Sequence, residues 1–492
     1  MKKKIYLLSL AAAVLLALLQ FTKIMTRPSV YRGGDCWPTN GFAAFYKMKP
    51  DTVDVLLFGS SIGVNNYDTQ EIYDSYGIRT YNLSSVQQAT PLSWYWLQEA
   101  LRYQSPRVVM LETRCLYSWN SAYVMNAAEA TFRDPLNQMR MSPLKVKCVK
   151  DYVAHEHNVK EASFYFPILR YHELWKDFDE DQLFGHDVYT QCLKGFAPGP
   201  DTIDGYEPLY LTDPGAVSEH ELDPVMISYL DKIIELCKEK DIQVALVTIP
   251  GENMTDGMHN QIKAYADSKE VRYYDFDEAE LFSQIGHHYP EETVYRHSNF
   301  GGAVRFSRLL GRILRDDFGV PAVHDEQYEV SRPYHEKLAQ NAHMPFISDL
   351  AEYTDNLLTD RYVILIAGRH DAAGGLTEDG LKMLNALGLS TDWVSSAPAG
   401  GYLAVHENGI DIQEWYGPGT EVSGSIRDGR DTYTLRCATD DGESSSRIQI
   451  NGKDYCANRK GLNIVVYDKE LKYVVDSISL SSYSGGDCTI QR

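Results

Sequence analysis

Short runs of apolar and β-branched residues alternate with longer amphipathic stretches across the region 29–324. The runs VDVLLFGSS, PRVVMLE and DIQVALVTIP are flanked by turn residues and are uniformly apolar, which is typical of strands buried on both faces. Between them, stretches such as DPVMISYLDKIIELCKEK carry apolar residues at helical spacing. The alternation predicts an α/β domain in which helices flank a parallel sheet.

The alternation stops between residues 116 and 208, where the sequence becomes aromatic and polar. We interpret this stretch as an insertion near the carboxyl edge of the sheet, where α/β domains hold their sites. After the insertion the pattern resumes, and the domain closes with an amphipathic helix that is ended by Gly319 and Pro321.

A polar, mostly helical linker is expected at 325–350, and a different pattern follows it. Between residues 351 and 492, short apolar segments are separated by turns that carry Asp-Gly and Asn-Gly. One helix, LTEDGLKMLNALG, is embedded among them. This pattern predicts a smaller, β-rich α+β domain.

The N-terminus has the pattern of a membrane anchor. Three lysines at positions 2–4 precede an uncharged run from Ile5 to Thr22, which is long enough to cross a hydrocarbon core of about 30 Å as a helix. The lysines should stay in the cytoplasm, and no small-residue cleavage site follows the run. We therefore expect residues 1–28 to be a transmembrane signal-anchor of a single-pass cell-membrane protein whose bulk is extracytoplasmic.

Composition narrows the range of partners. The 492 residues carry a formal net charge of −21, so nucleic acid would be repelled. The eight cysteines are scattered, and because none forms a metal-ligand cluster with histidine, neither a metal nor a cofactor is expected. Cys437, Cys456 and Cys488 are candidates for one disulfide in an oxidising compartment, or else are small buried apolar residues.

A serine can attack an acyl group when a base accepts its proton and hydrogen-bond donors stabilise the oxyanion. The first buried run leads directly into Gly59, Ser60 and Ser61. Gly59 permits a tight turn, and a helix starting after it would aim its N–H groups at the site. The alternative is an ordinary strand-to-helix turn capped by a serine.

This strand-Gly-x-Ser block resembles the first block of the SGNH (GDSL-like) hydrolase family, whose fold is a flavodoxin-like parallel sheet flanked by helices. The match implies Ser61 as the nucleophile. The segment YNLSSVQQAT is similar to the loop that lends oxyanion donors in relatives acting on the cell envelope. That resemblance implies Gln88 as a donor, with Gln87 as the fallback, and places Ser84 where glycine is usual, with its backbone N–H available.

The segment YRHSNFGGAVRFSRLL resembles the family's last block through His297, Asn299 and Gly302, followed by an apolar helix. The match implies His297 as the general base. One position departs from the family, because Val294 stands where the acid of the triad is expected. Loss of that acid costs about 10⁴-fold in rate in a serine protease. Three carboxylates from neighbouring turns are candidate substitutes for the acid: Glu291, Glu292 and Asp275. Otherwise the site is a Ser–His dyad, or it is no longer catalytic.

Two further residues are interpreted as structural, Glu112 and His172. Glu112 ends a predicted strand and is interpreted as a solvated strand end, with a role in the crevice as the alternative. His172 is interpreted as a packed histidine.

Beyond Leu350 the sequence resembles an ILEI/PANDER-like domain, which implies binding of carbohydrate or of a partner protein. Three aromatic residues there could stack on sugars or could be core residues: Tyr402, Trp415 and Tyr416.

The resemblances favour an extracytoplasmic serine esterase or O-acyltransferase that acts on a cell-envelope glycan. The expected partners are the polysaccharide, an acyl donor, the membrane and, for transfer, a membrane protein that supplies acyl groups. The alternative is a non-catalytic carbohydrate-binding or assembly protein that keeps the fold, which Val294 favours. A secreted signalling ligand fits poorly with a retained anchor.

Overall fold

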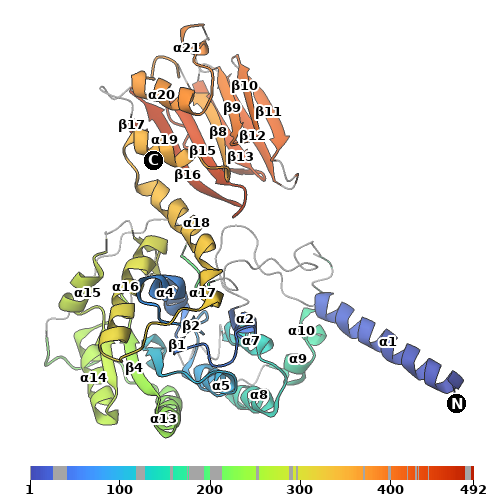
Figure 1. Cartoon of the computed structure of the whole chain (residues 1–492), viewed down its shortest axis with the longest axis vertical. Coiled ribbons are helices and arrows are strands. Elements are labelled where there is room, and N and C mark those ends of the chain that lie inside the picture. Colours follow the sequence, from blue (N-terminus) through green and yellow to red (C-terminus); the bar gives the residue numbers. More distant parts are fainter. Residues whose placement is uncertain are drawn as a thin grey trace. The chain divides into compact units, whose positions relative to one another are not determined.

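The computed structural model describes residues 2–25, 41–117, 128–155, 159–173, 176, 193–199, 213–250, 254–287, 292–294, 297–369, 372–396, 401–417, 419–426, 429, 431–440, 443–482 and 489–492. The chain divides into two compact units, Met1–Lys337 and Leu338–Arg492 (Figure 1). The division lies inside the segment predicted as a linker.

The first unit is built on a five-stranded parallel sheet with the order β2-β1-β3-β4-β5. This is the flavodoxin-like order of a doubly wound sheet, and it confirms the predicted fold class. The strands are β1 (Val55–Phe58), β2 (Thr80–Asn82), β3 (Val108–Glu112), β4 (Gln243–Thr248) and β5 (Arg272–Asp275).

Helices cover both faces of this sheet, with α4 and α16 on one face and α5, α8 and α13 on the other (Figure 1). Neighbouring strand residues alternate between the two cores: Leu56 packs in the core under α5 and α13, and Val55 in the core under α4 and α16. The helical segments of this unit after the N-terminal helix are α2 (Gly41–Phe45), α3 (Ser61–Asn66), α4 (Thr69–Tyr76), α5 (Thr90–Ala100), η1 (Arg114–Leu116), α7 (Ala128–Gln138), α8 (Pro143–His155), α9 (Ala162–Tyr165), α10 (Ile168–Tyr171), α13 (Pro224–Glu239), α14 (Asp256–Lys269), α15 (Ala279–Ile285), α16 (Phe300–Asp316) and α17 (Glu326–Glu329).

The N-terminal helix α1 (Lys2–Met25) is long and apolar enough to cross a membrane, by length and composition. None of the side chains described in its candidate span, Lys4–Thr22, is buried. A helix with this composition fits either a single-pass anchor or a signal sequence.

The end of the predicted insertion runs along the edge of the sheet beside β2. The backbone N–H of Asn82 donates to the carbonyl of Lys194 (2.9 Å), and the N–H of Ala197 donates to the carbonyl of Val64 in α3 (3.2 Å). Gly195 has φ +91°, and a Cβ there would lie 1.8 Å from the Asn82 carbonyl oxygen. Only glycine therefore allows this segment to approach the sheet so closely.

The segment that follows α16 is held to the first unit by a buried ion pair. His335 Nε2 lies 2.7 Å from Asp68 Oδ2, and both side chains are buried. Burial by itself would lower the pKa of His335, but the charge of Asp68 and the hydrogen bond to it outweigh burial, so the pKa is raised. His335 lies on α18 (Arg332–His343), so the start of this helix belongs to the first unit.

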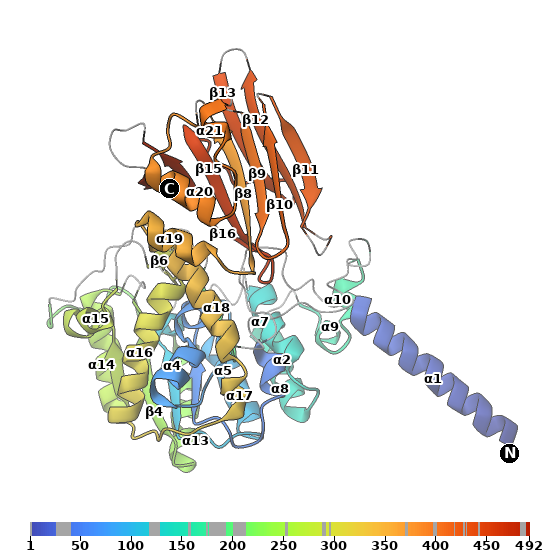
Figure 2. The same cartoon turned by 45° about the horizontal axis from the view of Figure 1, so that its top comes forward.

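The second unit contains two antiparallel sheets, as its β-rich pattern predicts. A six-stranded sheet has the order β10-β9-β8-β15-β16-β17, and a four-stranded sheet has the order β11-β12-β13-β14. Figure 2 shows both sheets. The strands are β8 (Tyr362–Arg369), β9 (Tyr402–Glu407), β10 (Asp411–Tyr416), β11 (Glu421–Ser425), β12 (Thr432–Asp440), β13 (Glu443–Ile450), β14 (Lys453–Asp454), β15 (Gly461–Asp468), β16 (Tyr473–Ser481) and β17 (Thr489–Gln491).

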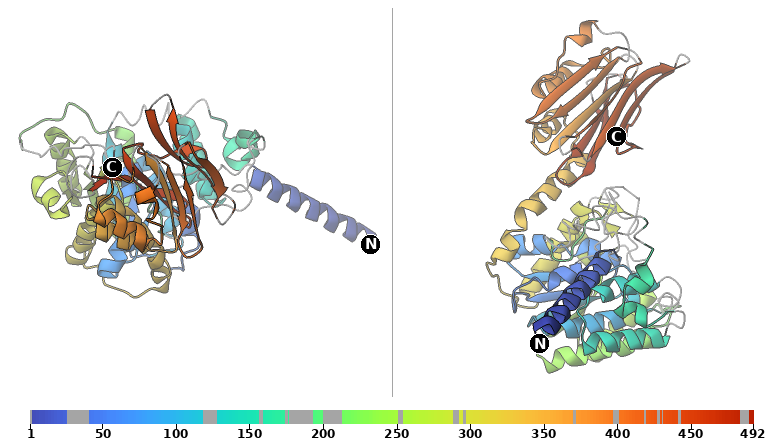
Figure 3. Two further views of the ribbon diagram at one scale, coloured as in Figure 1. Left: turned by 90° about the horizontal axis from the view of Figure 1, so that it is seen from above. Right: turned by 90° about the vertical axis from the view of Figure 1, so that its right-hand side faces the viewer.

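The central strands of the larger sheet, β8 and β15, are buried on both faces. Along β8, Leu365 packs toward the smaller sheet with Leu435 and Ile448, whereas Ile364 packs in a second core with Leu384. That second core lies under helices, which Figure 3 shows beside the strands. The helical segments are η4 (Met344–Phe346), α19 (Leu350–Leu357), α20 (Glu378–Ala386) and α21 (Trp393–Ser396).

The second unit contains the cysteines considered for a disulfide and the aromatic residues considered for sugar stacking. Cys437 and Cys456 are free thiols rather than disulfide partners, and Cys488 lies outside the described residues. Tyr402 is fully buried and stacks on Trp393 with ring centroids 4.2 Å apart, so it is a core residue. Tyr416 is 48% exposed, and Trp415 is half-buried.

The Asp68–His335 pair predicts a dependence of stability on pH. Because the pKa of His335 is raised above the value of about 6.5 in an unfolded chain, the pair stabilises the fold fully below about pH 6.5. This contribution is lost as pH rises through the folded pKa. The free energy of urea unfolding should therefore fall more steeply in the wild type than in His335→Gln as pH rises above about 6.5. A matched His324→Gln variant, at an exposed histidine, should keep the wild-type slope, and an equal slope in all three proteins would contradict the assignment.

Candidate active site

The candidate nucleophile lies in the turn between β1 and α3. Ser60 is the N-cap of α3, and its hydroxyl accepts the N–H of Ile62 (3.2 Å). Ser61 is the first residue of α3 and is buried. A Cβ at Gly59 would lie 2.9 Å from the Cβ and from a carboxylate oxygen of Glu112. Each residue of the motif therefore has a separate role. Gly59 allows the close approach of Glu112, Ser60 caps the helix, and the hydroxyl of Ser61 is not used in capping.

Glu112 lies at the end of β3, directly beside this turn. Its Oε2 accepts the backbone N–H of Ser60, and its Oε1 accepts the N–H of Arg114 (3.1 Å). The side chain is buried, so the interpretation as a solvated strand end is wrong. A buried carboxylate that accepts two backbone donors fixes the conformation of the turn that carries Ser61.

The candidate base lies on a short hairpin before α16. Strand β6 (Thr293–Val294) pairs with β7 (His297–Ser298), and Val294 is opposite His297. Asn299 is the N-cap of α16, because its Oδ1 accepts the N–H of Gly302 (3.2 Å). A Cβ at Gly302 would lie 2.4 Å from the Glu292 carbonyl oxygen. The Asn and Gly of the motif thus fix the hairpin against the helix and hold the histidine in place.

The two predicted residues meet. His297 Nε2 lies 3.0 Å from Ser61 Oγ, across 236 residues of sequence. This is the distance of a hydrogen bond between a nucleophile and its base. The pair lies at the carboxyl end of β1, where doubly wound sheets hold their sites.

Comparison with known proteins adds little to this geometry. No family model and no curated protein matches the chain. Among solved structures, it is similar to a protein from Bacteroides fragilis described as an acylhydrolase, with 12% identity and a TM-score of 0.27 over 57% of this chain and 95% of the other. It is also similar to a GDSL-like lipase from Bacteroides thetaiotaomicron, with 10% identity and a TM-score of 0.25 over 56% and 98%. Likenesses at this level do not decide the fold or the activity.

Two of the three carboxylates considered as replacements for the triad acid have other partners. Glu292 forms an ion pair with Arg305 (2.7 Å). Asp275, at the end of β5, accepts from Tyr273 (2.9 Å) and contacts the ring of His259 (2.8 Å). Glu291 lies outside the described residues. The described contacts of Glu292 and Asp275 are therefore with groups other than His297.

Asp275 belongs to a buried polar network that the sequence did not reveal. Burial by itself would lower the pKa of His259, but the hydrogen bond and the charge of Asp275 raise it. The hydroxyl of Tyr273 also contacts Thr248 (2.8 Å), which in turn contacts Thr113 (2.6 Å). The network connects the ends of β3, β4 and β5, so its partners come from four distant segments of the sequence.

The loop after β2 is arranged differently from the prediction. Gln88 is buried, and both hydrogens of its side-chain amide are donated, to the Leu83 carbonyl (2.9 Å) and to the Ser93 hydroxyl (2.9 Å). Its oxygen accepts from Ser85 (2.8 Å). An amide with both hydrogens committed to the loop cannot also donate to an oxyanion. In this structure Gln88 therefore holds the loop together.

Ser84 also departs from its expected role. Its backbone N–H, predicted to be available to the substrate, donates to the side chain of Asn82 (3.0 Å). Its buried hydroxyl has no hydrogen-bond partner in the described part of the chain and would lie 2.7 Å from a Cβ at Gly63 in α3. Gln87 is half-buried with φ +55°, a left-handed conformation that is unusual outside glycine and asparagine.

The arrangement of this loop predicts different effects for two neighbouring glutamines. Gln88→Ala should lower the free energy of unfolding by about 1–3 kcal/mol, because it leaves buried hydrogen-bonding groups of Leu83, Ser93 and Ser85 without a partner. Gln87→Ala, measured in the same urea titration, should change it by less than about 0.5 kcal/mol, since no described side-chain hydrogen bond involves Gln87. The reverse order would show that Gln88 does not hold the loop.

Proposed function

We propose that the protein is a membrane-anchored, extracytoplasmic serine esterase or O-acyltransferase of the SGNH type that acts on a cell-envelope glycan. The observation that carries the proposal is the 3.0 Å contact between Ser61 Oγ and His297 Nε2. Two residues 236 positions apart in the sequence converge on the geometry that an acyl-transfer nucleophile and its base require.

In the proposed reaction, Ser61 Oγ attacks the carbonyl carbon of an acyl ester while its proton passes to His297 Nε2. The bond to the leaving oxygen then breaks, and the imidazolium returns the proton to that oxygen. Water or a sugar hydroxyl next attacks the carbonyl carbon of the acyl-enzyme while its proton passes to His297. The bond between Ser61 Oγ and the acyl carbon then breaks, and His297 returns the proton to Ser61 Oγ. The choice between water and a sugar separates an esterase from a transferase.

The oxyanion would be stabilised from the amino end of α3. The N–H groups of Ile62 and Val64 already donate to Ser60, whereas the N–H of Ser61 has no acceptor in the described part of the chain. A backbone N–H at the nucleophile itself is the donor that oxyanion holes commonly use. Because both amide hydrogens of Gln88 are donated within its loop, the backbone N–H of Ser61 is the proposed oxyanion donor.

The other parts of the chain fit an enzyme that works at the cell surface. If α1 is retained as an anchor, it would hold the site near the membrane and raise its effective concentration toward surface polymers. The second unit, proposed as an ILEI/PANDER-like domain, would bind the carbohydrate. The net charge of −21 favours a neutral glycan over a polyanion.

A second candidate function is a non-catalytic glycan-binding protein that keeps this fold. The observation that favours it is Val294, which stands opposite His297 in the hairpin where a carboxylate would orient the imidazole.

Hydrolysis of a small acetyl ester by the purified full chain tests the proposed activity. Ser61→Ala and His297→Ala should each lower kcat/KM by about 10³-fold or more, because each removes a partner of the nucleophilic step. Ser60→Ala is the matched control: it removes the helix cap and costs about 1 kcal/mol of stability, but it should keep kcat/KM within about tenfold. If Ser61→Ala and the wild type hydrolyse the ester equally, the binding function is favoured.

A further inference from the structure

A cavity lies in the first unit, and neither Ser61 nor His297 lines it. Its volume is about 210 Å³, and its floor is almost entirely apolar. Helices α5 and α13 form one side, and α7 and α8 of the predicted insertion form the other. The larger buried side chains that line it are Tyr95, Phe132, Cys148, Tyr152, Met226 and Tyr229.

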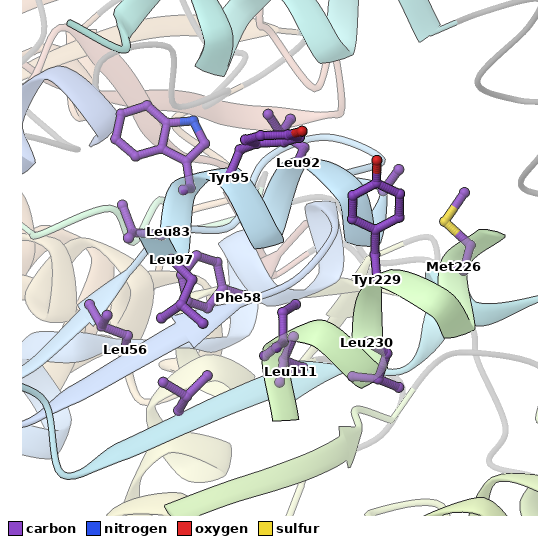
Figure 4. Close-up of a cluster of buried hydrophobic side chains, with 14 of the residues drawn as sticks. Leu56, Phe58, Leu83, Leu92, Tyr95, Leu97, Leu111, Met226, Tyr229 and Leu230 are labelled. Atoms are coloured by element: carbon purple, nitrogen blue, oxygen red, sulfur yellow. The ribbon is translucent and has the colours of Figure 1, made fainter. Parts of the chain in front are cut away.

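The cavity is sized for a small organic molecule. Well-packed protein interiors contain few voids larger than a water molecule, and a dry apolar cavity of about 150 Å³ binds benzene. Figure 4 shows Tyr95 on α5 and Met226 and Tyr229 on α13 at one edge of a buried apolar cluster. On the open side, Val225 is 38% exposed and His155 is exposed. A ligand can therefore enter from solvent.

A carboxylate–phenol cluster lies in the wall of this largely apolar space. The hydroxyls of Tyr95 and Tyr229 both donate to Oδ2 of Asp151, the second at 3.2 Å. Burial, reinforced by the Asp151 charge, raises the pKa of Tyr229 to about 12, so the phenol remains a donor at neutral pH. Since both hydroxyls use Oδ2, the other carboxylate oxygen, Oδ1, can accept a hydrogen bond from a ligand.

We propose that this cavity binds a small neutral ligand with an apolar body of about six to eight carbons and one hydroxyl donor. The aromatic floor would hold the apolar body, and Asp151 Oδ1 would accept the donor. An anionic ligand, including a free fatty acid, is disfavoured because its carboxylate would lie beside Asp151. The proposal goes beyond the proposed function, because it involves neither Ser61 nor His297.

Three probes that share one fluorophenyl ring separate these requirements: 4-fluorobenzyl alcohol, 4-fluorotoluene and 4-fluorobenzoate. Binding to the full chain in lipid nanodiscs is followed by fluorine NMR. We expect saturable one-to-one binding of the alcohol, binding of the toluene about tenfold weaker because it lacks the donor, and binding of the benzoate weaker still. An alcohol that does not saturate, or a benzoate that binds as tightly, would overturn the proposal.

Two buried cysteines provide matched variants. Cys148 lines the cavity, whereas Cys237 on α13 is equally buried in the same core but does not line it. Cys148→Leu should fill the space and weaken binding of the alcohol at least tenfold without lowering the midpoint of thermal unfolding. Cys237→Leu should lower that midpoint by overpacking and leave binding unchanged.

Asp151→Asn tests the polar end separately. Removing the charge should reduce the preference for the alcohol over the benzoate by about tenfold or more. If Cys148→Leu does not fold, Met226→Phe fills the same cavity from α13 and takes its place. Equal effects of the variants at Cys148 and Cys237, or an unchanged preference in Asp151→Asn, would show that the probes partition elsewhere.

Discussion

The hydrogen bond between Ser61 Oγ and His297 Nε2 is the contact on which the account of the site depends. The capped turn after β1 fixes Ser61, and the hairpin fixed to the start of α16 holds His297. The sheet order then sets the distance, because α3 and α16 pack on the same face. A serine and a histidine far apart in sequence can meet in this way only if both turns are rigid.

Local signals in the sequence were enough to identify both turns. A uniformly apolar strand that runs into Gly-Ser-Ser predicts a tight turn, and the family resemblance through His297, Asn299 and Gly302 implies a histidine before an apolar helix. The structure has both, with Ser60 as one cap and Asn299 as the other. The parallel sheet was predictable for the same reason, since strands buried on both faces differ in pattern from the helices around them.

What the sequence could not reveal are contacts between distant segments. Gln88 was expected to face the substrate, but its loop folds back and uses every hydrogen bond of the amide. Glu112 at a strand end and His335 in a polar connector both have the pattern of solvated residues. Both are buried, and each has a partner from a distant part of the chain. Glu112 accepts the backbone N–H of Ser60, and His335 contacts Asp68. Such partners depend on the tertiary fold, which periodicity and spacing do not encode.

The central claim, that His297 activates Ser61, is tested most directly by mapping the site of covalent modification with a fluorophosphonate. Such a reagent modifies a serine that an adjacent base has made nucleophilic. After digestion and mass spectrometry, the account predicts an adduct on Ser61 in the wild type and its loss in His297→Ala. An adduct on Ser60, or equal modification of Ser61 in the presence and absence of His297, would contradict it.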